Sequence, residues 1–209
     1  MVEKARAIAE AAARQNPDDF RFTGRIAILS RDYGAILRRT DPRRALRMFD
    51  EALAYIRATP NARSRREMAG LLANSSYALR DLGQVDEALA RIDEALALLR
   101  ETGQPLAEVE HTVRALADHY LATGHTHGAV DLLEQLRAGL ERWNLNLMGD
   151  LRDAAAVSRT WDALERAYAA DGQGQRARAY RRQRRELWNA WAVRQPRNAF
   201  VLRQREDAR

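Results

Sequence analysis

The stretch DLGQVDEALARIDEALALL, residues 81–99, decides the fold, because it sets small residues at fixed intervals within a Leu-rich helical segment. Gly83 is followed by Ala88 at +5, Ile92 at +9 and Ala95 at +12. Glycine suits a tight turn that ends one helix, and alanine suits positions where the next helix crosses a neighbour closely. The stretch therefore predicts a helix end, a tight turn and a second, closely packed helix.

The same offsets recur along the chain, which indicates internal repeats. The equivalent alanines are separated by 40, 43, 41 and 48 residues, and they are Ala5, Ala45, Ala88, Ala129 and Ala177. A period of about 20 to 50 residues is typical of repeat arrays. The alternative is a helical bundle in which alanines recur by chance. The matched tyrosines Tyr120 and Tyr168, each four residues before a glycine, argue against it.

The pattern Trp161-x2-Leu164-x3-Tyr168-x3-Gly172-x4-Ala177 resembles the tetratricopeptide repeat (TPR), and related copies cover nearly the whole chain. The resemblance implies an all-α, right-handed superhelical solenoid of antiparallel helix pairs, with a period longer than the usual length of about 34 residues. We expect about nine helices in a single solenoid over residues 1–209. It comprises a half repeat at 2–15, repeats at 18–58, 62–101, 105–142 and 147–194, and a C-terminal tail at 195–209.

The first helix matches only the second half of a repeat, so we expect this chain to be part of a longer protein and to self-associate weakly through this end. A second, weaker resemblance concerns the ending AYRRQRRELWNAWAVRQPRNAFVLR, residues 179–203. It is similar to the C-terminal TPR regions of bacterial Ser/Thr protein kinases, and Lys4 as the sole lysine fits a GC-rich bacterial source. The resemblance implies a sensor or docking region of a signalling protein.

Composition and charge limit the kinds of site and the cellular location that we expect. The absence of cysteine excludes disulfides and thiolate metal sites. No apolar run approaches the roughly 18 residues that span a bilayer, so we expect a cytoplasmic chain, or an extracytoplasmic one if the parent protein has an upstream span. The net charge is +6, but residues 173–209 hold eleven arginines against three acids and carry +8. The remainder of the chain is therefore slightly acidic, at −2.

Nothing in the sequence indicates catalysis. His125 and His127 with Asp131 form only a weak metal-binding pattern, and GHTHG at 124–128 is better explained as the polar turn of a repeat. Nucleotide-binding, nucleophile and kinase motifs are absent, so any kinase activity would lie upstream. We expect a chain that is not an enzyme and has no cofactor and no metal.

The TPR resemblance implies a concave groove formed by the first helix of each repeat. The polar residues that it places there are Arg31, Arg38, Asn74, Tyr77, His111, Arg114, Arg159 and Arg166. Arginine holds carboxylates well, so an extended, acidic protein segment or peptide is the expected partner. A second interpretation, equally supported by the sequence, is that these arginines pair with the neighbouring Asp32, Asp118 and Asp162. Both interpretations stay open at this point.

The Arg-rich segment QRARAYRRQRR, residues 175–185, offers an alternative function, the binding of nucleic acid or an anionic membrane surface. Its arginines surround the helix, while Tyr180, Leu187, Trp188 and Trp191 form an inward stripe rather than a stacking platform. We therefore interpret it as a soluble cap on the array. Nucleic acid is not the partner that we expect, and we expect no membrane insertion.

Overall fold

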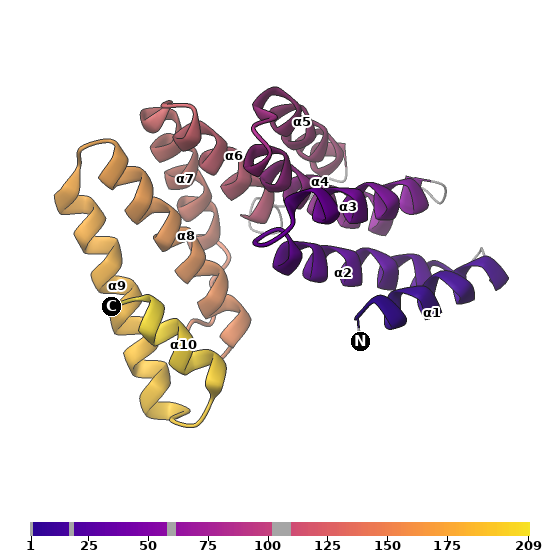
Figure 1. Ribbon diagram of the computed structural model, residues 1–209. Helices are drawn as coiled ribbons and strands as arrows, with labels where there is room; N and C mark the ends of the chain where they lie inside the picture. Colours follow the sequence, from indigo (N-terminus) through magenta and orange to yellow (C-terminus); the bar gives the residue numbers. More distant parts are fainter. Residues whose placement is uncertain (1, 17–18, 58–61, 102–109) are drawn as a thin grey trace. The chain divides into compact units, whose positions relative to one another are not determined.

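The computed structural model describes residues 2–16, 19–57, 62–101 and 110–209, and every regular element in them is an α-helix. There are ten helices in these residues (Figure 1): α1 (Val2–Gln15), α2 (Phe20–Leu37), α3 (Pro42–Arg57), α4 (Ala62–Asp81), α5 (Val85–Glu101), α6 (Glu110–Ala122), α7 (Thr126–Glu141), α8 (Leu151–Ala170), α9 (Gly174–Arg194) and α10 (Ala199–Asp207). The all-α class predicted from the sequence is confirmed. The boundary expected between the repeats 18–58 and 62–101, and the start of the repeat expected at 105–142, lie outside the described residues.

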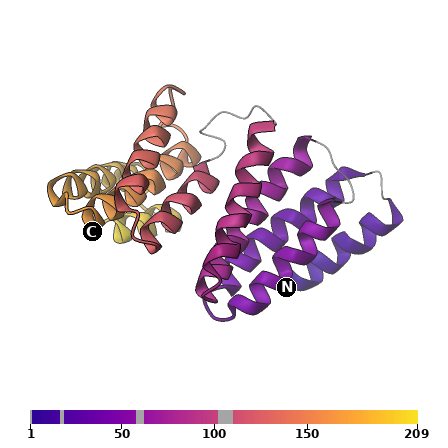
Figure 2. The same ribbon diagram turned by 90° about the horizontal axis from the view of Figure 1, so that it is seen from above.

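The chain divides into two compact units, Met1–Gln104 and Pro105–Arg209. In unit 1, helices that are consecutive in the chain from α1 to α5 pack against each other, and α2 also contacts α4 (Figure 2). In unit 2, helices that are consecutive in the chain from α6 to α10 pack against each other, and α6 also contacts α8. We call α2, α4, α6 and α8 the A helices, and α1, α3, α5, α7 and α9 the B helices. That the two units form one continuous solenoid stays a prediction.

The glycines and alanines of the repeat occupy the positions that the spacing predicts. Gly83, Gly124 and Gly172 have positive φ angles of 78°, 81° and 77°, a conformation that glycine adopts without strain. The residue after each glycine donates its backbone N–H five residues back, as in Gln84 to Leu79 at 2.9 Å. This bond closes each A helix with a Schellman turn. Ala88 is fully buried in unit 1, as is its counterpart Ala129 in unit 2.

The first A helix differs, because its turn has no positive-φ glycine. Gly34 lies inside α2, and a Cβ atom there would come within 2.3 Å of the ring of Phe49. The glycine is needed for a close helix contact rather than for the turn. The α2 helix therefore runs on to Leu37, and a turn at 38–40 precedes α3.

The prediction of nine helices is one short, because the expected tail at 195–209 contains α10. Asn198 caps this helix by accepting hydrogen bonds from the backbone N–H groups of Phe200 (3.0 Å) and Val201 (3.3 Å). Val201 and Ala208 are buried and pack with Trp188 in the core of unit 2. The sequence analysis ended the last repeat at residue 194 and missed this cap.

The repeat expected at 147–194 begins its first helix later than its expected start, at Leu151. The side chain of Asp150 accepts a hydrogen bond from the backbone N–H of Arg152 at 2.7 Å and sets the start of α8 there. Ahead of it lies an irregular segment with Asn144 at φ 49°. An aspartate at the N-cap is therefore the signal that fixes this boundary.

Candidate functional site

The predicted binding residues of unit 1 come from two A helices in contact, α2 and α4. The centre of this surface is Tyr77, whose ring centroid lies 5.0 Å from the guanidinium carbon of Arg38 and 4.6 Å from that of Arg80. These are cation–π distances. The sequence analysis missed Arg80, although it follows Tyr77 by three residues on the same helix. We call Arg31, Arg38, Asn74, Tyr77 and Arg80 the unit-1 A-helix face.

The closest acid partners of the arginines of this face are exposed. Arg31 pairs with Asp32 at 3.0 Å, and Arg38 pairs with Asp81 at 3.3 Å. Arg31 also lies 3.9 Å from Glu67, whose side chain is 15% exposed. The side chain of Asp32 is 63% exposed and that of Asp81 is 42% exposed. Exposed pairs of this kind contribute about 0 to 1 kcal/mol each. Another carboxylate can therefore replace either acid at low cost.

The side chain of Asn74 is less available to a binding partner than the sequence analysis predicts. It is buried, and its side-chain amide donates to the carbonyl of Gly70, one turn earlier in α4, at 2.8 Å. This bond uses one of the donors that the TPR resemblance assigns to a partner. A Cβ at Gly70 would meet only Arg31, at 3.7 Å, so the helix surface beside Asn74 stays open.

The predicted binding residues of unit 2 are on α6 and α8, and a buried acid pairs with two of the arginines. Glu110 pairs with Arg114 and, at 3.4 Å, with Arg159 of α8. Arg114 Nη2 also lies 3.5 Å from His111 Nδ1. Burial raises the pKa of the Glu110 carboxyl, but the attraction of the two arginines outweighs it and holds that pKa below its ordinary value. Glu110 therefore fastens α6 to α8.

A ladder of ion pairs continues across unit 2 from the last predicted residue, Arg166. It bonds Asp118 of α6 at 2.8 Å and Asp162 of its own helix at 3.3 Å. Asp162 also pairs with Arg184 of α9 at 2.6 Å, and Arg184 reaches Glu165 at 3.1 Å. The pairing of arginines with Asp32, Asp118 and Asp162, one of the two sequence interpretations, is thus present in the structure.

The remaining polar candidates form no reaction centre in the described residues. His127 lies 3.7 Å from Asp131 and 3.8 Å from Asp171, and its side chain is 78% exposed. No group of three metal-ligating side chains occurs within residues 2–16, 19–57, 62–101 and 110–209. Over those same ranges, no helix is long and apolar enough to cross a membrane.

The arginines of α9 divide into two sets. Arg184 is buried, Arg181 donates to Glu165 at 2.6 Å, and Arg176 donates to the hydroxyl of Tyr168 at 3.1 Å. The other set is exposed and recurs at i, i+4 and i+7, so it lies on one helix face: Arg178, Arg182 and Arg185. The sequence analysis, which counted all these arginines together, missed this stripe.

Comparison with solved structures identifies the architecture. One match is a variant of the TPR-like repeats of a Podosopora anserina putative kinesin light chain, with 21% identity and a TM-score of 0.57 over 93% of this chain and 89% of that one. A second structure of those repeats matches with the same identity and TM-score over 92% and 96%. The fold is a TPR-like helical array. No protein-family model and no curated protein matches the sequence.

Proposed function

We propose that this chain is a non-catalytic protein-binding scaffold, and that the unit-1 A-helix face holds an extended, acidic segment of its partner. Support comes from the exposure of the acids that now hold the arginines. In unit 1, Asp32 and Asp81 are 63% and 42% exposed, and the contact of Arg31 with the less exposed Glu67 is long, at 3.9 Å. In unit 2, Arg166 also pairs with the half-exposed Asp162, but Glu110 and Asp118 are only 8% and 13% exposed. A partner displaces exposed acids readily, but displacing Glu110 would strand a buried charge.

Tyr77 gives this face its anchor. Its ring offers an apolar surface flanked by the charges of Arg38 and Arg80, and aromatic and arginine side chains are enriched among the residues that contribute most to protein interfaces. The face thus combines an apolar centre with cations that can pair with acidic side chains. This arrangement fits a partner segment that alternates acidic and apolar residues.

The test compares capture of partners from an extract of the source cells by three forms of the chain. The double variant Arg38→Ala, Tyr77→Ala should lose the specific partner. Arg43→Ala removes an exposed arginine of α3 outside the face, so this variant should retain it. Matched melting temperatures would show that all three forms are folded. Equal capture by the double variant and the wild type would overturn the proposal.

A second function, binding of nucleic acid, is favoured by the exposed stripe of Arg178, Arg182 and Arg185. Phosphate contacts by such a stripe weaken steeply with salt. Replacing the three residues with glutamine should abolish salt-sensitive binding to a generic duplex if this function is real. Absence of binding by the wild type at low salt would remove the candidate.

The narrower interpretation, a docking region of a bacterial Ser/Thr kinase, is supported by the sequence resemblance alone. The parent reading frame tests it, since a kinase domain should precede these repeats. Cytoplasmic location and weak self-association through α1 stay predictions in the same way. For the latter, one supporting feature is Ile8, which is 62% exposed on α1.

A further inference from the structure

An open hollow of about 500 Å³ lies on the exposed side of α9, entirely within unit 2. Five residues of this helix line it: Gln175, Arg176, Arg178, Ala179 and Arg182. Ala179 contributes only a methyl group, so the space lies above it and between the longer side chains. We call this space the α9 hollow.

Two arginines of the α9 hollow keep their donors for a guest. Arg178 and Arg182 are exposed, and neither forms a hydrogen bond or an ion pair with the described part of the chain. They lie on the same helix face, about 6 Å apart along the helix axis. Arg176 donates to the hydroxyl of Tyr168, a neutral group, at 3.1 Å. The charges of Arg178 and Arg182 are therefore not balanced by an ion pair.

The acids nearest to the α9 hollow in the sequence do not balance these charges. Asp171 accepts hydrogen bonds from the side chains of Gln173 (2.7 Å) and Thr126 (2.9 Å). Glu186 follows Arg182 by four residues and is exposed, but it forms no ion pair with any residue that the structure describes. The hollow thus keeps a positive charge that is open to solvent.

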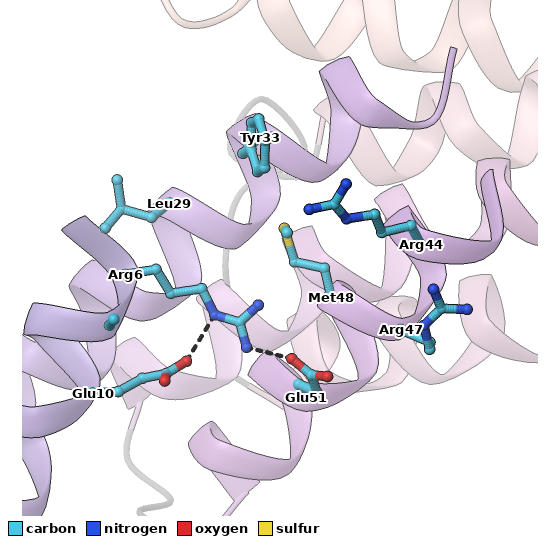
Figure 3. Close-up of a pocket in the computed structure, with 9 residues that line it drawn as sticks. Arg6, Glu10, Leu29, Tyr33, Arg44, Arg47, Met48 and Glu51 are labelled. Carbon is cyan, nitrogen blue, oxygen red and sulfur yellow. Dashed lines mark hydrogen bonds and ion pairs between the residues drawn. The ribbon is translucent and has the colours of Figure 1, made fainter. Parts of the chain in front are cut away.

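A hollow in unit 1, between α1 and α3, has the opposite arrangement (Figure 3). There Arg6 Nε lies 2.8 Å from Glu10, and Arg6 Nη2 lies 2.6 Å from Glu51. Both acids line that hollow, so the chain neutralises its own arginine there. Among the described residues, no acid lines the α9 hollow. An arginine-lined hollow in this chain is therefore not a site for an anion unless its arginines are unpaired, as they are on α9.

The lining of the α9 hollow indicates which anion fits. Protein partners are usually anchored by a buried aromatic or apolar side chain, and for such an anchor this surface offers only the methyl group of Ala179. Nucleic acid needs no such anchor, because arginine and glutamine bind phosphate oxygens and the release of counterions drives association. No aromatic side chain of the described residues lines the hollow, so bases have no surface on which to stack there. The lining therefore favours phosphate groups over both acidic peptides and bases.

We propose that the α9 hollow holds the phosphodiester backbone of a nucleic acid, with neighbouring phosphates on Arg178 and Arg182 and without contact with the bases. This inference rests on the second function proposed above, and it names the part of the arginine stripe that contacts phosphate. Arg185, three residues further along α9, does not line the hollow and contributes only attraction at longer range. The strand is therefore bound irrespective of its base sequence.

The first test measures the binding of fluorescein-labelled oligothymidylate by fluorescence anisotropy over a series of salt concentrations. Arg182→Gln and Arg185→Gln remove the same charge from the same helix, so attraction at long range alone predicts equal losses. With phosphate in the hollow, Arg182→Gln should weaken binding roughly tenfold and reduce the slope of log affinity against log salt by about 0.7. Arg185→Gln should have a smaller effect on both. Oligodeoxyadenylate of the same length should bind like oligothymidylate.

A second pair of variants tests the hollow without any change of charge. Ala179→Leu fills the space and should weaken binding of the same oligonucleotide severalfold. Ala190→Leu makes the same change at a half-buried position of α9 outside the hollow, so this matched control should bind like the wild type. Melting temperatures would show that both variants are folded.

The outcomes separate this inference from the function on which it rests. Equal losses for Arg182→Gln and Arg185→Gln, or unchanged binding by Ala179→Leu, would overturn the placement of phosphate in the hollow while nucleic-acid binding stands. Absence of binding by the wild type at low salt would remove the second function and this inference with it. Tighter binding of polyglutamate than of the oligonucleotide would overturn the choice of phosphate and assign the hollow to an acidic protein segment.

Discussion

The two units have the same helix pairing but use their charged side chains differently. In unit 2, the buried acid Glu110 joins the A helices, and Glu134 accepts hydrogen bonds from the hydroxyls of Tyr168 and Tyr180. In unit 1, Asp32 and Asp81, which pair with arginines of the A-helix face, are exposed. The difference suggests that unit 2 uses these polar groups for stability, while unit 1 leaves its own accessible to a partner.

The largest expected effect comes from Glu110→Gln in unit 2. Arg114, which is only 13% exposed, would lose its ion pair with the buried carboxylate of Glu110, so we expect a loss of about 2 to 4 kcal/mol in the free energy of unfolding. Denaturant titration measures this loss. A loss below about 0.5 kcal/mol, the size typical of a surface substitution, would show that unit 2 is no more dependent on its ion pairs than unit 1.

The Glu110→Gln variant also tests how the stability of the chain depends on pH. The pKa of Glu110 is lowered in the folded chain from its ordinary value of 4.5, so its stabilising effect is present above that value and is lost as the pH falls through the lowered pKa. The stability difference between the wild type and Glu110→Gln should therefore be constant near neutral pH and shrink below pH 4.5. A difference that grows on acidification would contradict the assigned role of Glu110.

A second substitution tests the register on which the comparison of the units depends. Ala88 and its counterpart Ala129 are both fully buried, so Ala88→Leu and Ala129→Leu should each overpack a helix contact and cost about 1 to 3 kcal/mol. Ala97 is exposed on α5, and Ala97→Leu is the matched control that should melt like the wild type. If only one of the two variants, Ala88→Leu or Ala129→Leu, melted like the wild type, the repeats of the two units would not be equivalent.

A third substitution tests whether unit 2 uses Glu134 for stability. Glu134→Ala removes the acceptor of three donors and should cost about 1 to 2 kcal/mol. Acetate should then raise the melting temperature of this variant more than that of the wild type, because it can take the place of the missing carboxylate, whereas acetamide should not. Equal effects of acetate and acetamide would mean that the tyrosine and arginine donors do not recognise a carboxylate.

Features set by the backbone could be predicted from the sequence, whereas the pairing of side chains could not. Gly83 and Ala88 act through a turn and a close contact that recur with the period, so spacing alone locates them. The pairs Arg159 with Glu110 and Arg166 with Asp118 join residues 49 and 48 positions apart, and their strength depends on burial.

The smallest expected effect on stability concerns Asp81 in unit 1. Asp81→Asn breaks the exposed pair with Arg38 and should cost less than about 1 kcal/mol. The same change leaves Arg38 available beside Tyr77, so it should strengthen binding of a glutamate-rich peptide to the unit-1 A-helix face. If Asp81→Asn destabilised the chain as much as Glu110→Gln, or weakened peptide binding, the arginines of unit 1 would be structural too and the contrast between the units would disappear.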